Sequence, residues 1–358
     1  MAITKIEVPE LFDFGSDNSA FKLPTGTTAE RPTSPSNGEM RFNTTTGYVE
    51  YYDTTDAQWW EIDYAINSLT VNYLIVGGGG GGGGGNLPNG GNGGGGGGAG
   101  GLRTSYGSSS GGGANAETSL NILVSTNYTV TVSAGGSGGA YGSSGTNGSD
   151  SIFSTITSDG GGYGGSNADG AAGGSGGGGG ADVVGTAFYG GTATASQGYN
   201  GGNGDNTSAP YNYWGGGGGG ASQAGTNGNQ DSNLPDGGDG LAVSITGSPV
   251  TYAGGGGGGN WSDSNNTGQA SGGAGGGGNG SVRTSNSSGF NGTDNLGGGG
   301  GGGGANGSGG AGGSGVVILR YSSAYTITAG GSLTSSTITD GTDKVTTFTA
   351  GSDTITFS

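Results

Sequence analysis

The sequence predicts a mainly irregular and β fold with essentially no α-helix, whose interior is built from backbone rather than from side chains. Two observations carry this prediction. Glycine makes up 100 of the 358 residues, and the glycines come in runs such as 77–85, 254–259 and 297–304. Short β-like stretches, for example 71–76 and 316–321, stand between those runs. A flexible linker has no need of such an alternation.

Composition by itself favours disorder, because glycine is abundant, the net charge is −17 and only 28% of the residues are hydrophobic. Two other numbers oppose disorder. Charged residues are only 9% of the chain, and aromatic residues reach 8%, whereas disordered segments are usually poor in aromatics. We therefore expect a folded body that lacks an ordinary hydrophobic core.

Several function classes are excluded by residues that the sequence lacks. Cysteine and histidine are absent, which removes disulfides, Cys or His zinc sites and His-based triads. We expect no metal, no cofactor and no enzymatic activity, since nothing marks Asp159 and Asp169 as a glycosidase pair. Only eight Lys and Arg residues occur, so no surface for nucleic acid is expected. Neither a signal peptide nor an apolar run of about 18–20 residues is visible, so membrane insertion is not expected.

Residues 1–64 have an ordinary composition and are predicted to form an N-terminal β-hairpin module for attachment. Residues 22–38 are rich in Pro, Thr and Ser and are predicted to be extended. The predicted strands are 41–43, 48–52 and 58–62, joined by turns at 44–47 and 53–57. A sheet this small is marginally stable alone, so it is expected to pack against copies of itself or against a partner.

Residues 65–320 form the glycine-rich region. About ten glycine-rich segments can be counted: 77–85, 90–101, 135–139, 160–165, 173–180, 215–220, 254–259, 272–280, 297–304 and 307–315. Glycine gains little from an α-helix or a sheet, but an extended helix with three residues per turn is open to it. Such helices bond sideways to their neighbours, and a side chain between them would force them apart. The sequence therefore predicts a polyglycine II sandwich with short β-strands at one end.

Residues 321–358 are predicted to form a C-terminal β tail. In 345–349 and 354–357, threonine alternates with apolar residues. The Ala-Gly-Ser-Asp sequence between these two stretches predicts a hairpin turn.

Several short sequence segments of this chain resemble the glycine-rich domain of bacteriophage tail-fibre and tail-tip adhesin proteins. They are NYLIVGGGG at 72–80, SITGSPVTYAGGGGGG at 244–259 and GGSGVVILRY at 312–321. The stretch 30–62 separately resembles a short module of phage fibres and other virion appendages. The resemblance implies a virion protein whose loops bind a host cell-surface glycan or an outer-membrane protein. It also implies that residues 1–64 contact other virion proteins, and that the chain is a possible homotrimer; a mount on the tail or on the capsid stays open.

If the glycine segments run alternately up and down, their connections meet at two ends. Loops 86–89, 181–214 and 260–271 would then share one end, and loops 102–134, 221–253 and 281–296 the other. The first group carries the aromatic residues that we predict to bind the receptor: Phe188, Tyr189, Tyr199, Tyr211, Tyr213, Trp214 and Trp261. Aromatics among small polar residues are typical of recognition loops. The alternative is that these aromatics only cover the end of the sandwich.

Three functions are compatible with this sequence. The first is a phage fibre or adhesin that binds a host receptor, and the second is a purely structural decoration of the capsid or tail. The third, an ice-binding or matrix protein, predicts a flat repeating Ala/Thr face and disulfides, and the sequence contains neither. In the first two cases the protein is made in the host cytoplasm and ends in the virion.

Overall fold

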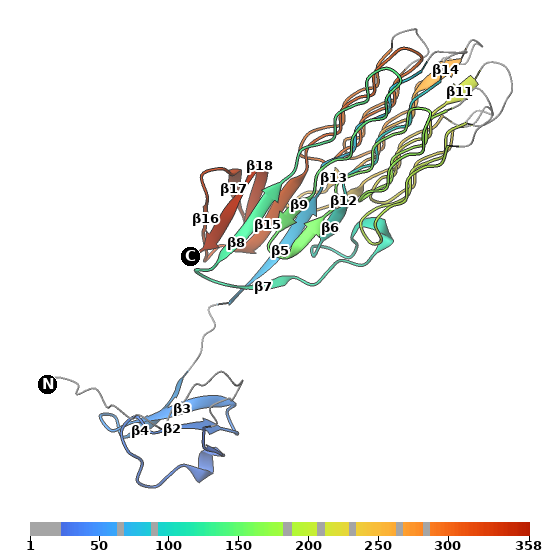
Figure 1. The fold of residues 1–358 in the computed structure, drawn as a ribbon. Coiled ribbons are helices and arrows are strands. Elements are labelled where there is room, and N and C mark those ends of the chain that lie inside the picture. Colours follow the sequence, from blue (N-terminus) through green and yellow to red (C-terminus); the bar gives the residue numbers. More distant parts are fainter. Residues whose placement is uncertain are drawn as a thin grey trace, which may run out of the picture. The chain divides into compact units, whose positions relative to one another are not determined.

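The computed structural model describes residues 23–62, 68–86, 92–181, 188–205, 212–228, 234–262, 268–281 and 287–358 (Figure 1). The chain divides into two compact units, Met1–Asn67 and Ser68–Ser358. Within the described residues the only helices are two single 3₁₀ turns, η1 (Thr28–Glu30) and η2 (Gly111–Gly113). The predicted fold class, mainly irregular and β, is therefore confirmed.

The first unit contains a four-stranded sheet in the order β1-β2-β3-β4. The strands are β1 (Thr25–Gly26), β2 (Met40–Asn43), β3 (Tyr48–Asp53) and β4 (Gln58–Ile62). Strands β2 to β4 form an antiparallel meander, as the sequence predicts, while β1 adds a short parallel edge. The part of 22–38 that is described is not extended throughout, because it includes the turn η1.

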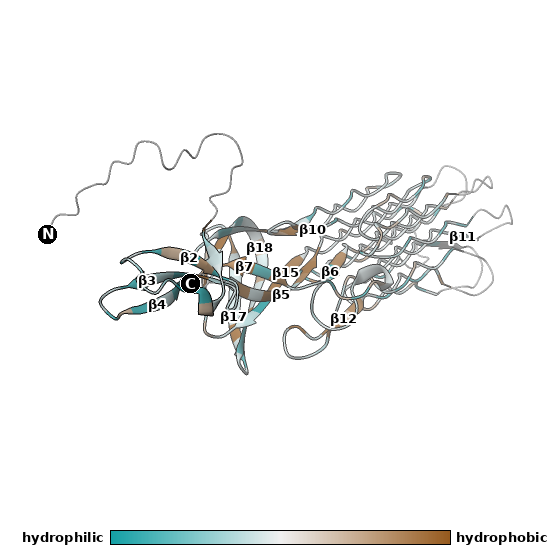
Figure 2. Cartoon of the chain, turned by 90° about the horizontal axis from the view of Figure 1, so that it is seen from below, coloured by the Kyte–Doolittle hydropathy of each residue, from teal (hydrophilic) through white to brown (hydrophobic). Residues whose placement is uncertain are grey.

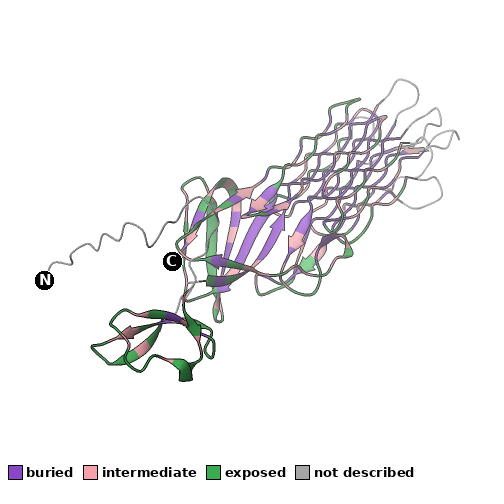
Figure 3. Cartoon of the chain, turned by 60° about the horizontal axis from the view of Figure 1, so that its bottom comes forward, coloured by how far each residue is buried: buried purple, intermediate pink, exposed green. Residues whose placement is uncertain are grey.

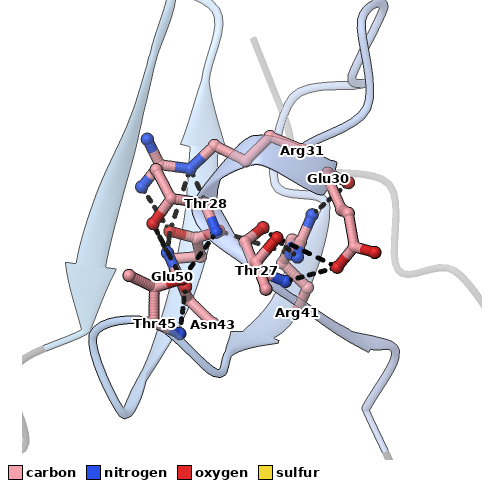
Figure 4. A network of polar contacts seen from close by, with 8 residues as sticks. All are labelled: Thr27, Thr28, Glu30, Arg31, Arg41, Asn43, Thr45 and Glu50. Atoms are coloured by element: carbon pink, nitrogen blue, oxygen red, sulfur yellow. Dashed lines mark hydrogen bonds and ion pairs between the residues drawn. The ribbon is translucent and has the colours of Figure 1, made fainter.

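One face of this sheet encloses ionic side chains (Figure 4). Glu50 is fully buried and Arg41 is 5% exposed, and the two form an ion pair. Arg31 and Asn43 also donate hydrogen bonds to the Glu50 carboxylate. Burial alone would raise the pKa of Glu50, but these hydrogen bonds and the two guanidinium charges lower it below its usual value.

The residues on the opposite face of the sheet are apolar and are exposed or half-buried (Figure 3). Two rows of cross-strand neighbours run over β2, β3 and β4 on this face: Met40, Tyr51 and Trp60, then Phe42, Val49 and Ile62. Met40 and Trp60 are 42% and 43% exposed. The enclosed face of this sheet is thus mainly polar, with Trp59 packed against Tyr52 and beneath the Arg41 guanidinium, while the opposite face is apolar.

The second unit begins with a ten-stranded sheet that is buried by side chains. Its strands are β5 (Ser68–Val76), β6 (Leu102–Thr104), β7 (Leu120–Leu123), β8 (Asn127–Val132), β9 (Ser151–Phe153), β10 (Ile156–Ser158), β15 (Val316–Ser322), β16 (Ile327–Ala329), β17 (Thr334–Asp340) and β18 (Asp343–Phe357). The central strands β5 and β15 read as apolar runs because both of their faces are covered. One face holds Tyr73, Leu319 and Phe348, and the other holds Leu74 and Ile318. Hydrophobic residues concentrate in these strands (Figure 2).

The C-terminal residues belong to this sheet rather than to a separate tail. The predicted hairpin of 345–349 with 354–357 is wrong, because β18 runs through both stretches as one strand. Gly351 has a φ of +97°, which lets the strand bend where glycine is favoured. Before the bend β18 pairs with β15 and β17, and after it with β8 and β16. The hairpin that does form joins β17 to the first half of β18.

Beyond the sheet, the chain passes back and forth through a bundle of extended segments, which we call the glycine stack (Figure 1). Its eighteen described segments are 77–86, 92–101, 134–142, 143–150, 159–166, 168–174, 175–181, 188–194, 198–205, 213–221, 223–228, 234–240, 253–260, 268–274, 275–281, 287–295, 297–304 and 307–315. The sequence predicts only about ten. The predicted segment 272–280, for example, is two segments, because the chain turns back at Gly275 and Gly276, which have φ near +97°.

Backbone hydrogen bonds in the stack repeat every three residues. In 77–86, the amides of Gly77, Gly80 and Gly83 donate to segment 92–101. The amides one residue further along donate to 143–150, and the next set donates to 307–315. Its carbonyls accept bonds from three further segments, so this segment has six bonded neighbours. A period of three is what polyglycine II helices require; the helix type itself stays a prediction.

Six segments are interior in this sense: 77–86, 92–101, 175–181, 213–221, 253–260 and 297–304. Each contains at least five consecutive glycines. A Cβ atom built on Gly97 lies 2.1 Å from the Gly80 carbonyl oxygen, and one built on Gly81 lies 2.0 Å from that of Ser137. Alanine is found only near the ends of these interior segments, as at Ala99 and Ala181. Close contact between backbones therefore dictates glycine in the interior of the stack.

Outer segments use polar side chains to complete their backbone bonding. The side-chain oxygens of Asn203 and Asn291 accept hydrogen bonds from the amides of Gly190 and Ala311, at 3.0 and 2.9 Å. Asp169 accepts in the same way from Tyr189, at 2.8 Å. The described backbone network provides no carbonyl acceptor for these three amides, so a side chain supplies the acceptor instead. Much of the Asn and Asp content of this region is therefore structural.

Candidate functional site

The stack has two ends that differ in chemistry. One end continues into the ten-stranded sheet, where Val76 leads into Gly77 and Gly315 leads into Val316. The other end, here called the distal end, carries the short strand pair β11 (Asn212–Trp214) and β14 (Asn260–Ser262) (Figure 1). A second small pair, β12 (Leu241–Val243) with β13 (Val250–Tyr252), packs against the large sheet. The predicted placement of strands at one end therefore holds except for β11 and β14.

The residues that flank nine of the chain's connections lie at the distal end. The described residues that flank them are Asn86 and Asn92, Ala140 and Ser143, Ser166 and Ala168, Ala181 and Phe188, Asp205 and Asn212, Gly228 and Leu234, Ser262 and Gly268, Ser281 and Ser287, and Gly304 and Gly307. Direct bonds join several of these positions, for example the amide of Gly304 to the Ser287 carbonyl at 3.0 Å. The residues that flank these nine connections thus gather on one side of the second unit, away from its sheet.

The predicted grouping of the loops is partly wrong. Range 181–214 contains two additional segments, 188–194 and 198–205, so it visits both ends. Range 281–296 was expected at the sheet end, but Ser281 bonds to Gly302 at the distal end. The error arises because outer segments are not rich enough in glycine to be counted from sequence.

The seven predicted receptor-binding aromatics do not all lie together. Phe188 and Tyr213 are partly exposed at the distal end, and Tyr189, which follows Phe188, is 60% exposed. Tyr199 lies at the sheet end, where its amide donates to Gly220, next to the residue bonded by η2. Trp214 is distal but only 1% exposed. The prediction of one exposed aromatic cluster is therefore wrong for two residues: Tyr199 lies at the opposite end of the stack, and Trp214 is buried.

Two of the predicted binding residues lie partly or wholly outside the described residues. Trp261 pairs with Tyr213 across β11 and β14, but its side chain lies outside the described residues. Tyr211 lies wholly outside them. Sequence reasoning missed Tyr141, which is 49% exposed at the distal turn between 134–142 and 143–150. The sequence feature that could have identified Tyr141 is its place between two stretches with glycine at every third residue.

Beneath the exposed aromatics, the distal end contains buried polar groups without hydrogen-bond partners in the described structure. They include the Ser166 hydroxyl, the indole N–H of Trp214 and the side-chain oxygens of Asn92 and Asn260, and the Ser175 hydroxyl elsewhere in the stack is unpaired as well. Asn92 is 3% exposed and Asn260 is fully buried. Trp214 and Asn260 are direct cross-strand neighbours. The segments that end at Asn92, Trp214 and Asn260 are hydrogen-bonded to one another, since Gly93 bonds Tyr213 and Gly215 bonds Gly259.

Positive charge in the second unit is confined to the sheet end, as far as the described residues show. Arg103 pairs with Glu117 at 2.7 Å, and Arg320 pairs with Asp340 and Asp343 at 2.7 and 2.8 Å. Lys344 donates to the Tyr325 carbonyl. The distal connections add one Arg, at 283, against three Asp, at 182, 231 and 263. The distal end is therefore neutral to acidic.

The described side chains form few arrangements that are typical of a catalytic site. No group of three or more acidic residues there could hold a metal ion. A hollow of about 430 Å³ lies at the sheet end beside Ser133, Asp294 and Gly351, but the Asp294 carboxylate already accepts the Ser314 amide. Burial raises the pKa of Tyr252 to about 12 and raises that of Tyr73 as well, so both remain neutral phenols. Within the described residues no helix is long and apolar enough to cross a membrane.

Comparison with known proteins places most of the chain in one family. A family model described as a glycine-rich domain matches residues 54–322, which include the whole glycine stack. No curated protein and no solved structure matches this sequence. Since the match covers well over half of the chain, the protein belongs to this family of glycine-rich domains.

Proposed function

We propose that this chain is a bacteriophage fibre or adhesin protein that binds a host cell-surface glycan or outer-membrane protein through its distal end. The convergence of the distal connections supports this proposal most. The stack fixes the ends of its segments through backbone bonds, so the sequence of each connection is free to vary without loss of the interior. A rigid body with variable loops at one end is suited to recognition.

The first unit is proposed to attach the protein to other virion proteins. Its apolar face, with Met40, Tyr51 and Trp60 exposed, is larger than scattered surface residues would explain. A small sheet with a polar interior also needs further burial to be stable. Other virion proteins, or copies of this chain in a homotrimer, would cover that face. No catalytic role and no cofactor are proposed.

A purely structural role as a capsid or tail decoration is the second candidate. It is favoured by the use of Asn and Asp side chains as backbone acceptors, since those groups are then unavailable to a ligand. The burial of Trp214 points the same way. In that case the protein would stay in the virion and contact no host surface.

Adsorption of the purified full chain to host bacteria, and its competition with virus adsorption, distinguishes the two roles. In the test variant, 206–211 and 263–267 are replaced by Gly-Ser sequences of equal length. The control carries the same kind of replacement at 246–248, the turn between β12 and β13 at the sheet end. Recognition predicts that only the first variant loses adsorption. If the wild-type protein neither adsorbs nor competes, the result supports the structural role instead.

A further inference from the structure

Asparagine followed by glycine occurs ten times in this chain, and six of these pairs share one arrangement in the outer segments of the glycine stack. The Asn side-chain oxygen accepts the amide of a neighbouring segment, and the Gly amide donates to a carbonyl of that same segment. Asn147 accepts from the Tyr163 amide at 3.0 Å, for example, and Gly148 donates to the Gly161 carbonyl at 2.9 Å. We call this two-point attachment an Asn-Gly clamp. The clamps contain Asn147, Asn200, Asn203, Asn227, Asn279 and Asn291.

An Asn-Gly pair is also the dipeptide in which asparagine deamidates most readily, because glycine adds no side chain beside its own nitrogen and restricts the backbone least. The glycine nitrogen attacks the Asn Cγ atom, so a C–N bond forms and a cyclic imide closes. The bond from Cγ to the side-chain nitrogen breaks, and this nitrogen leaves as ammonia with the proton of the glycine amide. Solvent water then opens the imide to aspartate or isoaspartate. The reaction therefore needs a glycine amide without its hydrogen bond and an Asn side chain that is free to turn toward it.

A clamp opposes both requirements. It fixes the Asn side chain through its oxygen, and it occupies the glycine amide in a second bond to the same neighbour. The reaction has to wait until the two segments separate locally, so its rate is reduced to the fraction of time that they spend apart. Two further described pairs are held in other ways: Asn37, in the first unit, accepts from the Thr54 amide, and Asn92 is 3% exposed and donates to Asn167.

Asn306 differs from all the other described asparagines that precede a glycine. Within the described part of the chain, no hydrogen bond holds its side chain, which is partly exposed. The Gly307 amide donates to the Gly304 carbonyl at 2.7 Å, and this bond closes only a short turn at the distal end. Opening that turn leaves the bonds between neighbouring segments in place, so the two reacting groups of this pair can meet in the folded protein.

We propose that the folded chain deamidates at Asn306, while the clamps protect the six asparagines that they contain. The product places a carboxylate in a distal connection, so an aged molecule becomes more acidic at this end of the stack. At a clamp the same reaction would damage the stack, because isoaspartate adds a carbon atom to the backbone and shifts the period of three. This inference does not depend on the proposed recognition function, since it rests on hydrogen bonds within the stack.

The first test follows deamidation of the full chain by mass spectrometry at mildly alkaline pH in H₂¹⁸O, so that the label marks only conversions that occur during the incubation. Chymotryptic cleavage after Phe290 and Tyr321 releases a region that contains both Asn291 and Asn306. Fragmentation of its peptides then compares a clamped with an unclamped pair from the same sample. Protein unfolded in guanidinium chloride gives the rate of each pair without structure.

We expect similar rates for Asn291 and Asn306 in the unfolded chain, because glycine follows both. In the folded chain Asn306 should react at least about ten-fold faster than Asn291, the factor that about 1.4 kcal/mol of additional local opening provides. Equal rates in the folded chain would overturn the inference.

The second test removes one half of a clamp from the partner segment. Asn291 accepts from the Ala311 amide at 2.9 Å, and Ala311→Pro deletes this N–H while its fixed φ suits an extended three-residue helix. Deamidation of Asn291 should become about five-fold faster, the effect of losing one net hydrogen bond. Ala311→Ser keeps the amide and is the matched control, and the Asn203 clamp in the same molecule should keep its wild-type rate.

Two further results would contradict the proposal. One is an unchanged Asn291 rate in a folded Ala311→Pro protein, which means that the side-chain bond gives no protection. The other is a folded wild-type chain in which Asn306 is converted no faster than the clamped asparagines other than Asn291. Should the proline variant fail to fold, the comparison within the wild-type protein still decides, because it needs no substitution.

Discussion

The ten-stranded sheet and the glycine stack are parts of one continuous chain, yet their interiors are built from different atoms. In the sheet, side chains such as Leu319 and Phe348 fill the space between strands. In the stack, carbonyl oxygens of one segment lie where the side chains of the next would stand. The chain crosses from one construction to the other within a single residue, at Val76 to Gly77.

This difference teaches that the two interiors fail in opposite ways. A sheet interior is damaged when atoms are removed, because a cavity replaces buried apolar surface. A stack interior is damaged when atoms are added, because there is no space between neighbouring backbones. Alanine substitutions can therefore probe both interiors. In the sheet, alanine replaces a large side chain; in the stack, alanine replaces a glycine.

The largest effect is expected from removing a side chain in the sheet. Phe348→Ala empties a fully buried site between β15 and β17, and should lower the free energy of unfolding of the second unit by about 4 kcal/mol. Chemical denaturation followed by circular dichroism measures the change. Ile338→Ala, at an exposed position of the neighbouring β17, is the control and should change little.

Adding one methyl group to the stack should cost almost as much. Gly97→Ala places a Cβ 2.1 Å from the Gly80 carbonyl oxygen in an interior segment, so two backbones must separate. We expect a loss of about 3 kcal/mol, the upper part of the usual range for overpacking. Gly331→Ala is the matched control, since its Cβ would meet nothing within 4 Å. Equal stability of the two variants would show that the backbone interior is looser than the structure has it.

Much of this comparison can be predicted from sequence, for a physical reason. Only a segment surrounded on all sides must be glycine at every position, so runs of five or more glycines mark the six interior segments. The meander at 40–62 is equally predictable, because its strands and turns are local.

The outer segments could not be found in this way. A segment with neighbours on one side needs glycine only where it faces inward, as at Gly145 and Gly148 or Gly225 and Gly228. The remaining positions hold Ser, Thr, Asn and Ala, which look like loop sequence. The misplacement of Tyr199 follows from the same error, since one uncounted segment moves a residue to the opposite end. The path of β18 was missed because its partners lie far away in the sequence.

The first unit has a third kind of interior, built from ionic side chains. Its stability should depend on pH, whereas the stability of the stack, whose interior consists of uncharged amides, should not. Because the folded-state pKa of Glu50 is lowered, its contribution to stability is present above the unfolded pKa of about 4.3 and is lost as the pH falls through the folded value. Losing these charge-assisted bonds should cost the first unit about 2 kcal/mol. Hydrogen-exchange pulses after incubation at pH 3 should label 39–62 before 93–101; simultaneous labelling would contradict a separate ionic interior.

The smallest effect is expected at the surface of the stack, where side chains substitute for missing neighbours. Asn203→Ala removes the acceptor of the Gly190 amide, a half-buried bond of 3.0 Å, and should cost about 1 kcal/mol. Thr192→Ala, at an exposed position on the segment that contains Gly190, is the control. Faster exchange of the Gly190 amide in the first variant alone would show that asparagine completes the backbone network. Unchanged exchange would mean that solvent serves the outer amides equally well, and that the asparagines of the outer segments remain available for recognition.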